Sequence, residues 1–224
     1  MSTTAAIRRN EYNALSRNDL GIRLLRRVPV MPCAASNNPF NKFGKASPQL
    51  RKADDNGSTA EDMRMELRKA MRLFPQGVTV ATTQTKEGPR GLTVSSFISV
   101  SLDPPLVLIS LGKGTEIHDL FVEADSFAVN LLASDQRQLS ERFAGESDLA
   151  RRFEGFGFHG GTTGSPVLDG ALAVVECSVW RIYEGGDHSL ILGKVVRASA
   201  LRNVKPLVYH AQKYVTVSDH APSQ

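Results

Sequence analysis

Two strand-like runs that meet at a cluster of small hydroxyl side chains constrain this chain more than any other feature. The first run covers residues 91–97. The second covers residues 98–110 and turns at Asp103-Pro104-Pro105 before it continues as an apolar strand. Alternating side chains predict strands, and the proline pair predicts the turn between them. Because the side chains at the junction are small, we expect a backbone there that is open to a flat ligand.

The rest of the chain predicts mainly β structure with few helices. The first helix is expected to begin with a capping box formed by Ser58 and Glu61 and to end at Phe74-Pro75, and the turn at residues 184–187 is expected to join two long strands. Together these elements predict a closed or nearly closed antiparallel barrel. Strands are expected at residues 77–83, 90–94, 97–101, 106–111, 126–132, 171–183, 189–201 and 213–217, with further helices at 115–124 and 134–143 and a helical turn at 149–153.

Positive charge is concentrated near the N-terminus. The net charge is +4, yet residues 1–60 hold 10 Lys and Arg against 4 Asp and Glu, and the remaining residues hold 17 against 19. The main domain therefore gives no electrostatic reason to expect a nucleic-acid partner. We expect a flexible basic extension at residues 1–57, a folded domain at 58–218 and a short tail at 219–224.

The two cysteines, Cys33 and Cys177, are too few for a disulfide framework, which predicts a reduced, cytoplasmic protein. The 5 histidines show no metal-ligand spacing, so no metal site is expected. No apolar run approaches the length of a membrane span, so no membrane partner is expected.

A glycine-rich segment, residues 112–116, follows an apolar strand and precedes a helix expected to begin at Thr115. Backbone amides at a helix start, together with Lys113, could bind an anion. The glycine spacing of a P-loop is absent, so an ordinary turn with a solvated Lys113 remains an alternative. If the hydroxyl cluster at Thr93, Ser95 and Ser96 lines a flavin ring, a phosphate site one strand away fits a ribityl chain, with Ser110 between them. A strand corner with solvated hydroxyls is the alternative.

His188 follows the expected hairpin turn, where a rigid element would present its imidazole. It could bond the carboxamide of a nicotinamide or stack on its ring, although a histidine at a strand start can also be plain polar surface. Asp187 is expected to serve the turn through its own backbone. No convincing nucleophile is present, which favours chemistry carried by an organic cofactor.

Seven segments, in the right order, resemble the flavin reductase family, the reductase components of two-component flavin monooxygenases. The resemblance implies a mainly β fold, an antiparallel, Greek-key-like FMN-binding split barrel with short flanking helices. It also implies a homodimer with flavin sites near the subunit interface. The matching segments are residues 74–80, 91–97, 99–107, 127–131, 138–144, 185–188 and 206–210.

The same resemblance implies the site residues. His188 would position the nicotinamide as the catalytic residue, with Tyr209 and Tyr214 lining the same pocket, and Phe143 would border the flavin. The ring and ribityl chain would contact Gly91, Thr93, Val94, Ser95 and Ser96, and the phosphate would contact Ser110, Leu111, Gly112, Lys113 and Thr115.

The leading hypothesis is an NAD(P)H:flavin oxidoreductase that passes a hydride from NADH or NADPH to FMN or FAD and supplies reduced flavin to a partner monooxygenase. A non-catalytic flavin-binding or carrier module on the same barrel is the alternative. An oxidase of a phosphorylated pyridoxine-type substrate ranks last, because the pocket segments hold no cluster of basic residues for a substrate phosphate.

Overall fold

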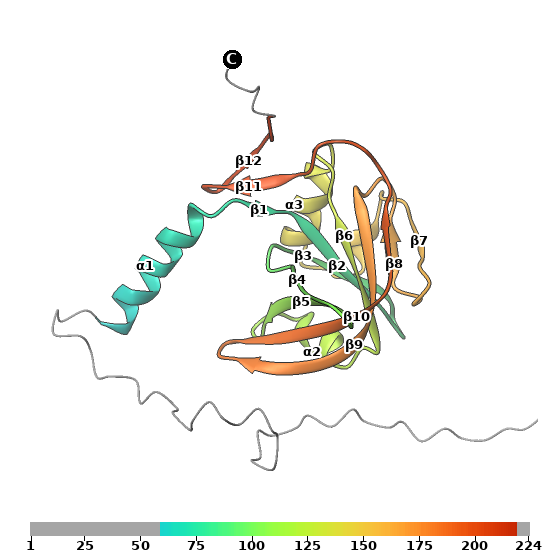
Figure 1. Ribbon diagram of the computed structural model, residues 1–224, viewed down its shortest axis with the longest axis horizontal. Helices are drawn as coiled ribbons and strands as arrows, with labels where there is room; N and C mark the ends of the chain where they lie inside the picture. Colours follow the sequence, from blue (N-terminus) through green and yellow to red (C-terminus); the bar gives the residue numbers. More distant parts are fainter. Residues whose placement is uncertain (1–58, 219–224) are drawn as a thin grey trace, which may run out of the picture. The chain divides into compact units, whose positions relative to one another are not determined.

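The computed structural model describes residues 59–218, and Figure 1 shows their arrangement. The extension expected at residues 1–57, the tail expected at 219–224 and the expected cap Ser58 lie outside the described residues. None of the helices within residues 59–218 is both long and apolar enough to cross a membrane.

Seven antiparallel strands form the main sheet, which confirms the expected mainly β architecture. Their order across the sheet is β3 (Gly88–Val94), β2 (Thr79–Thr85), β6 (Ser126–Leu131), β9 (Ala173–Gly185), β10 (His188–Ala200), β5 (Pro105–Gly112) and β4 (Ile98–Leu102). Each of these strands lies within two residues of an expected one at both ends. The fold is that of a split barrel, and Figure 1 shows β9 and β10 as its long hairpin, with α2 (His118–Val122) beside it.

The two edge strands of this sheet, β3 and β4, are joined directly in sequence, and the link between them bonds to β5. The hydroxyl of Ser96 donates to the carbonyl of Ser110 at 2.9 Å and accepts from the amide of Ser110 at 3.0 Å. The Ser96 side chain therefore satisfies the backbone amide and carbonyl of Ser110, as a neighbouring strand would do. These two bonds form the seam between the end of β3 and β5.

Two smaller sheets pack beside the barrel, and most of their strands were not predicted. One consists of β1 (Gln76–Gly77), β11 (Val208–His210) and β12 (Lys213–Val215), and the other of β7 (Phe158–Gly160) and β8 (Pro166–Leu168). Only β12 was expected. The others are two or three residues long, too short to show an alternation.

The first two helices begin later than expected. In α1 (Ala60–Arg72) the capping box joins Thr59 to Asp62, one residue beyond the predicted pair: the Asp62 amide donates to Thr59 Oγ1 at 3.2 Å, and the Thr59 amide donates to the Asp62 carboxylate at 2.8 Å. Helix α2 begins at His118, because the Thr115 hydroxyl donates to the Gly112 carbonyl at 2.8 Å and closes a turn instead of capping a helix.

The third helix, α3 (Arg137–Gly145), begins three residues after the expected start. A turn precedes it, in which the Gln136 side chain accepts from the Ala133 amide at 3.0 Å. The expected helical turn farther along is confirmed as a 3₁₀ helix, η1 (Arg151–Phe153).

Apolar packing holds β3, β5 and α3 in fixed positions. The barrel interior contains Ile109, Leu111, Phe127 and Ile191, all buried. A second cluster lies between the barrel and α3, where the rings of Phe143 and Phe153 meet edge to face with centroids 4.9 Å apart. Burying a large apolar side chain stabilises a fold by about 1.5–3 kcal/mol, so the strands that carry the expected site rest on a rigid core.

Candidate functional site

The centre of β3 is packed tightly against α3. Gly91 and Val94 are buried. A carbon atom added at Gly91 would lie only 2.7 Å from the Phe143 ring, so glycine is required there. Phe143 is itself 1% exposed. In a flavin site its contribution would be to fix β3 from within the core rather than to offer an open ring face.

The three hydroxyl side chains at the junction have different roles. Thr93 donates to the carbonyl of Ser140 in α3 at 2.7 Å, and Ser96 bonds to the backbone of Ser110 on β5. Ser95 is exposed and makes no side-chain hydrogen bond within residues 59–218. Of the three, Ser95 therefore has the hydroxyl that is open to a ligand.

The expected phosphate loop follows β5, in which Leu111 is buried and Gly112 is half-buried, and residues 113–115 of the loop are exposed. The Lys113 ammonium contacts the carboxylate of Glu184 and donates to the carbonyl of Gly186 at 3.0 Å. The Lys113 amide also donates to the Asp187 carbonyl at 2.9 Å. Both the backbone and the side chain of Lys113 thus hold this loop against the β9–β10 hairpin.

His188 lies beside the same loop. It pairs with Gly112 across β10 and β5, and its Nδ1 atom lies 2.7 Å from the Asp187 carboxylate. The hydrogen bond to His188, together with the charge of a protonated imidazole, holds the pKa of Asp187 below its usual range. Because Asp187 engages Nδ1, the Nε2 atom is left for a ligand, and a carbon added at Gly112 would lie 3.7 Å from it. The structure therefore brings Lys113 and His188 together.

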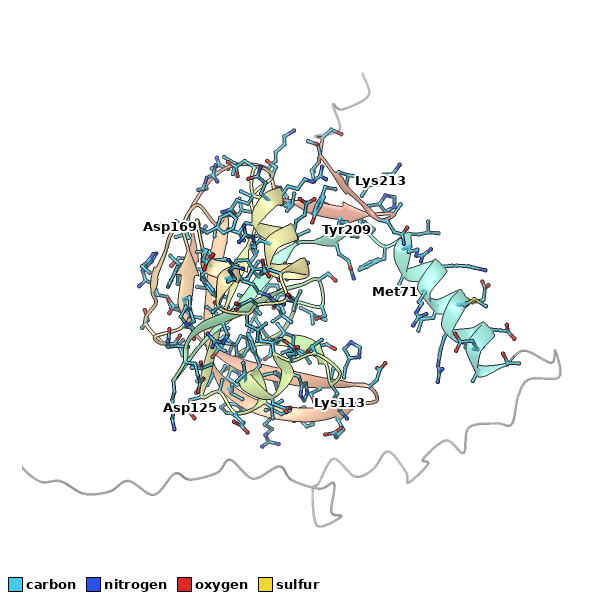
Figure 2. All side chains as sticks on the ribbon, turned by 180° about the vertical axis from the view of Figure 1, so that it is seen from behind. Met71, Lys113, Asp125, Asp169, Tyr209 and Lys213 are labelled. Atoms are coloured by element: carbon cyan, nitrogen blue, oxygen red, sulfur yellow. The ribbon has the colours of Figure 1, made fainter. Side chains whose placement is uncertain are left out.

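Tyr209 and Tyr214 belong to a separate cluster. Their rings pack against each other with centroids 5.2 Å apart, and the Tyr214 hydroxyl lies 3.0 Å from Ser140 Oγ. Ser140 also receives the Thr93 hydrogen bond, so this pair is connected to β3 through α3. Figure 2 shows Tyr209 and Lys113 well separated on the domain. Within one chain, the two tyrosines are not beside His188.

Three contacts near these residues were missed by sequence reasoning. Ser140 connects Thr93 to Tyr214, the Asp187 carboxylate orients His188, and the Arg152 guanidinium donates to the Gly91 carbonyl at 2.9 Å. The adjacency of Asp187 and His188 was a signal that could have been used. Arg152 and Gly91 are 61 residues apart, and nothing in the sequence pattern connects them.

Other parts of the described domain offer weaker candidates. A pocket of about 320 Å³ at the start of α3 is lined by residues that include Asp135, Gln136, Asp169 and Arg202, and by none of the expected site residues. Within residues 59–218, no three His, Cys, Asp or Glu side chains gather closely enough to hold a metal ion.

Comparison with known proteins gives consistent matches over the described domain. Residues 71–218 match the family described as "Flavin reductase like domain". The chain is 45% identical to the FMN reductase (NADH) SmoA of Agrobacterium fabrum, over 63% of this chain and 79% of that protein. It is 40% identical to the reductase component of the flavin-dependent trigonelline monooxygenase of Acinetobacter baylyi, over 58% of this chain and 42% of that protein.

Solved structures agree. The NADH:FAD oxidoreductase SgcE6 of Streptomyces globisporus, in complex with NAD and FAD fragments, superposes with a TM-score of 0.64 and 37% identity. The superposition covers 71% of this chain and 93% of that protein.

Proposed function

Because the chain belongs to the flavin reductase family, we propose that it reduces FMN or FAD with a nicotinamide cofactor and supplies the reduced flavin to a partner monooxygenase. Relatives and solved structures bear the names of NADH-dependent FMN and FAD reductases, and none of those compared supports a non-catalytic carrier. NADH is therefore the expected hydride donor.

The residues present suit a flavin. Ser95 offers an open hydroxyl at the end of β3, and Ser110 lies across the seam from Ser96. Farther along, nothing lies within 4 Å of a carbon added at Gly114, so the loop backbone is accessible. We assign the ring and ribityl contacts to Gly91, Thr93, Val94, Ser95 and Ser96, supported by Phe143, and the phosphate contacts to Ser110, Leu111, Gly112, Lys113 and Thr115.

The observation that carries the proposal is the placement of His188 beside this loop. When bound, the flavin accepts a hydride from the nicotinamide. The protein contributes orientation, because the reacting atoms must come within about 3–3.5 Å of each other in the right direction. Asp187 fixes the imidazole of His188, which is then positioned to hold the carboxamide of the nicotinamide. No side chain needs to act as an acid or base.

Steady-state kinetics of the full chain test this proposal. Oxidation of NADH should require both the protein and added FMN or FAD, and it should saturate with each substrate. Oxidation that stays at the uncatalysed rate with both flavins and both nicotinamide cofactors would refute it. Comparison of the four combinations also identifies the preferred flavin and hydride donor.

A homodimer is part of the proposal, because two apolar faces are uncovered in the single chain. None of the residues of α1 is buried, although its apolar side chains repeat at helical spacing. The edge strand β4 also exposes its apolar side chains, and Leu102 is 88% exposed. Exposed apolar faces and open strand edges favour a protein partner, and we assign these faces to a second copy of the chain. The faces comprise Met63, Leu67 and Met71 on α1 and Ile98, Val100 and Leu102 on β4.

A cytoplasmic location is likewise proposed. The support is Cys177, a free and buried thiol that takes part in no disulfide.

A further inference from the structure

Arg152 lies next to the proposed flavin strand, on the short helix η1. Its neighbour Phe153 is buried against Phe143, which anchors the helix to the core. The guanidinium reaches back over β3: its Nε atom donates to the Glu146 carbonyl at 2.8 Å, and Nη1 donates to the Gly91 carbonyl at 2.9 Å. These two bonds fix the side chain at the outer edge of β3.

The charge of this guanidinium has no counter-ion within residues 59–218. Both of its hydrogen-bond partners are neutral carbonyls, and no carboxylate in the described domain lies within 4.0 Å of it. Partial burial lowers the pKa of Arg152, and the carboxylates of Glu116 and Glu146 offset only part of that effect. A partly desolvated cation gains free energy when an anion binds to it.

The guanidinium also has donors to spare. It carries five N–H groups, and the two carbonyls occupy two of them. Nη2 makes no hydrogen bond within residues 59–218, and because no buried side-chain nitrogen or oxygen there lacks a partner, Nη2 is open to solvent. A bound anion could therefore contact it without displacing either carbonyl.

The structure gives less support to the two other groups that the sequence predicted to bind a phosphate, which are Lys113 and the start of a helix at Thr115. Lys113 is already engaged by Glu184 and by the Gly186 carbonyl. The helix expected to begin at Thr115 is only five residues long and begins at His118. The loop follows β5, and β5 meets the end of β3 at the bonds between Ser96 and Ser110. The strand whose Gly91 carbonyl binds the guanidinium is therefore also the strand that adjoins the loop.

We propose that Arg152 binds the phosphate of the flavin, which would lie between the residue 112–116 loop and the edge of β3. This inference rests on the proposed function. The oxidised flavin ring is neutral, whereas its phosphate carries roughly two negative charges at neutral pH, as other phosphomonoesters do. Arginine is suited to this group because its planar fork donates two parallel hydrogen bonds to phosphate oxygens.

Flavin binding by the full chain tests the assignment without a turnover assay. Fluorescence titrations with FMN and with riboflavin, which lacks the phosphate, are compared for the wild type, Arg152→Gln, Arg152→Lys and Arg151→Gln. Arg151 is the matched control, because it is exposed on the same helix and its side chain lies 3.6 Å from Glu154. Thermal unfolding of each variant checks that the domain is folded.

Removal of the charge at Arg152 should weaken FMN binding about 10- to 100-fold, the range for losing hydrogen bonds to a charged group. Riboflavin binding should change less than about twofold, because riboflavin has no phosphate for Arg152 to bind. The FMN affinity of Arg152→Lys should fall between those of the wild type and Arg152→Gln. Equal losses for FMN and riboflavin, or no loss of FMN affinity in either Arg152 variant, would overturn the assignment. Failure of the wild type to bind any flavin would instead refute the proposed function.

Discussion

His188 and Asp187 form the residue pair on which the proposed orientation of the nicotinamide depends. The carboxylate engages Nδ1 of the imidazole, and the ring stands beside Gly112 at the start of the loop. Sequence reasoning selected His188 but assigned Asp187 to the turn backbone. The structure adds that the carboxylate orients the ring, so the two residues act as one unit.

Replacement of His188 by alanine should raise KM for NADH about tenfold, the cost of losing one well-placed hydrogen bond. The dissociation constant for FMN should remain within about twofold, because His188 is not assigned to flavin. His159→Ala is the control, since His159 also lies beside a carboxylate, Asp169 at 3.2 Å, yet belongs to β7. An equal loss of FMN and NADH affinity in His188→Ala would contradict the assigned role.

Cys177 is expected to be unreactive in the folded protein. Burial raises the pKa of its thiol to about 12, and the neighbouring charge of Glu176 adds to the effect. An unfolded chain ionises this thiol near pH ~8.5, so between that pH and about 12 only the unfolded state releases the proton. The fold therefore loses stability as the pH rises through this window.

A Cys33→Ser variant isolates Cys177 for measurement. At pH ~8, below the ordinary thiol pKa, a thiol-reactive dye should label it rapidly in denaturant and very slowly in buffer. Rapid labelling of the folded protein would mean that Cys177 is not enclosed in the barrel.

Among the elements, the end of β3 and β5 are connected beside the proposed site by the side chain of one serine. Ser96 makes the two hydrogen bonds at this seam, whereas its neighbour Ser95 makes none within the described residues. The two serines therefore form a matched pair.

Ser96→Ala should lower the free energy of unfolding by about 1–3 kcal/mol, because it leaves the Ser110 backbone groups without their partner. Ser95→Ala should change it by less than about 0.5 kcal/mol. Denaturant titration measures both. Equal stability of the two variants would show that the hydroxyl bridge does not hold the seam.

The main elements were predictable because their patterns are local. The strand expected at residues 106–111 is β5 (Pro105–Gly112), and the hairpin turn falls where its glycines indicated. The predicted start of α2 was wrong because the Thr115 hydroxyl bonds to the Gly112 carbonyl and closes a turn. A turn of this kind and a helix cap have the same residue spacing, so the sequence pattern does not distinguish them. The contact between Arg152 and Gly91 depends on tertiary packing and left no pattern to detect.

The apolar faces of α1 and β4 are uncovered in the single chain, which is the basis for the proposed homodimer. A lone helix of 13 residues is marginal in water, so its apolar face is expected to be covered in the assembled protein. Both faces belong to the domain that carries the proposed site, so a variant of either face can be measured for assembly and for flavin reduction.

If the proposed dimer forms through α1, Leu67→Glu should convert it to a monomer at micromolar concentration, because the change places a charge in the apolar face of this helix. Lys69→Glu, on the opposite face of the same helix, should leave the dimer intact. Sedimentation equilibrium of both variants and the wild type decides the matter. A wild type that is monomeric throughout would contradict the proposed assembly.

The proposed function requires that this chain bring a nicotinamide and a flavin together for direct hydride transfer. Anaerobic mixing of NADH with FMN, with and without the protein, measures this transfer, because loss of the yellow flavin colour then reports reduction alone. Bleaching of the flavin is expected at a rate that rises with protein concentration. Flavin that stays oxidised at the protein-free rate, with FMN and FAD and with NADH and NADPH, would contradict it.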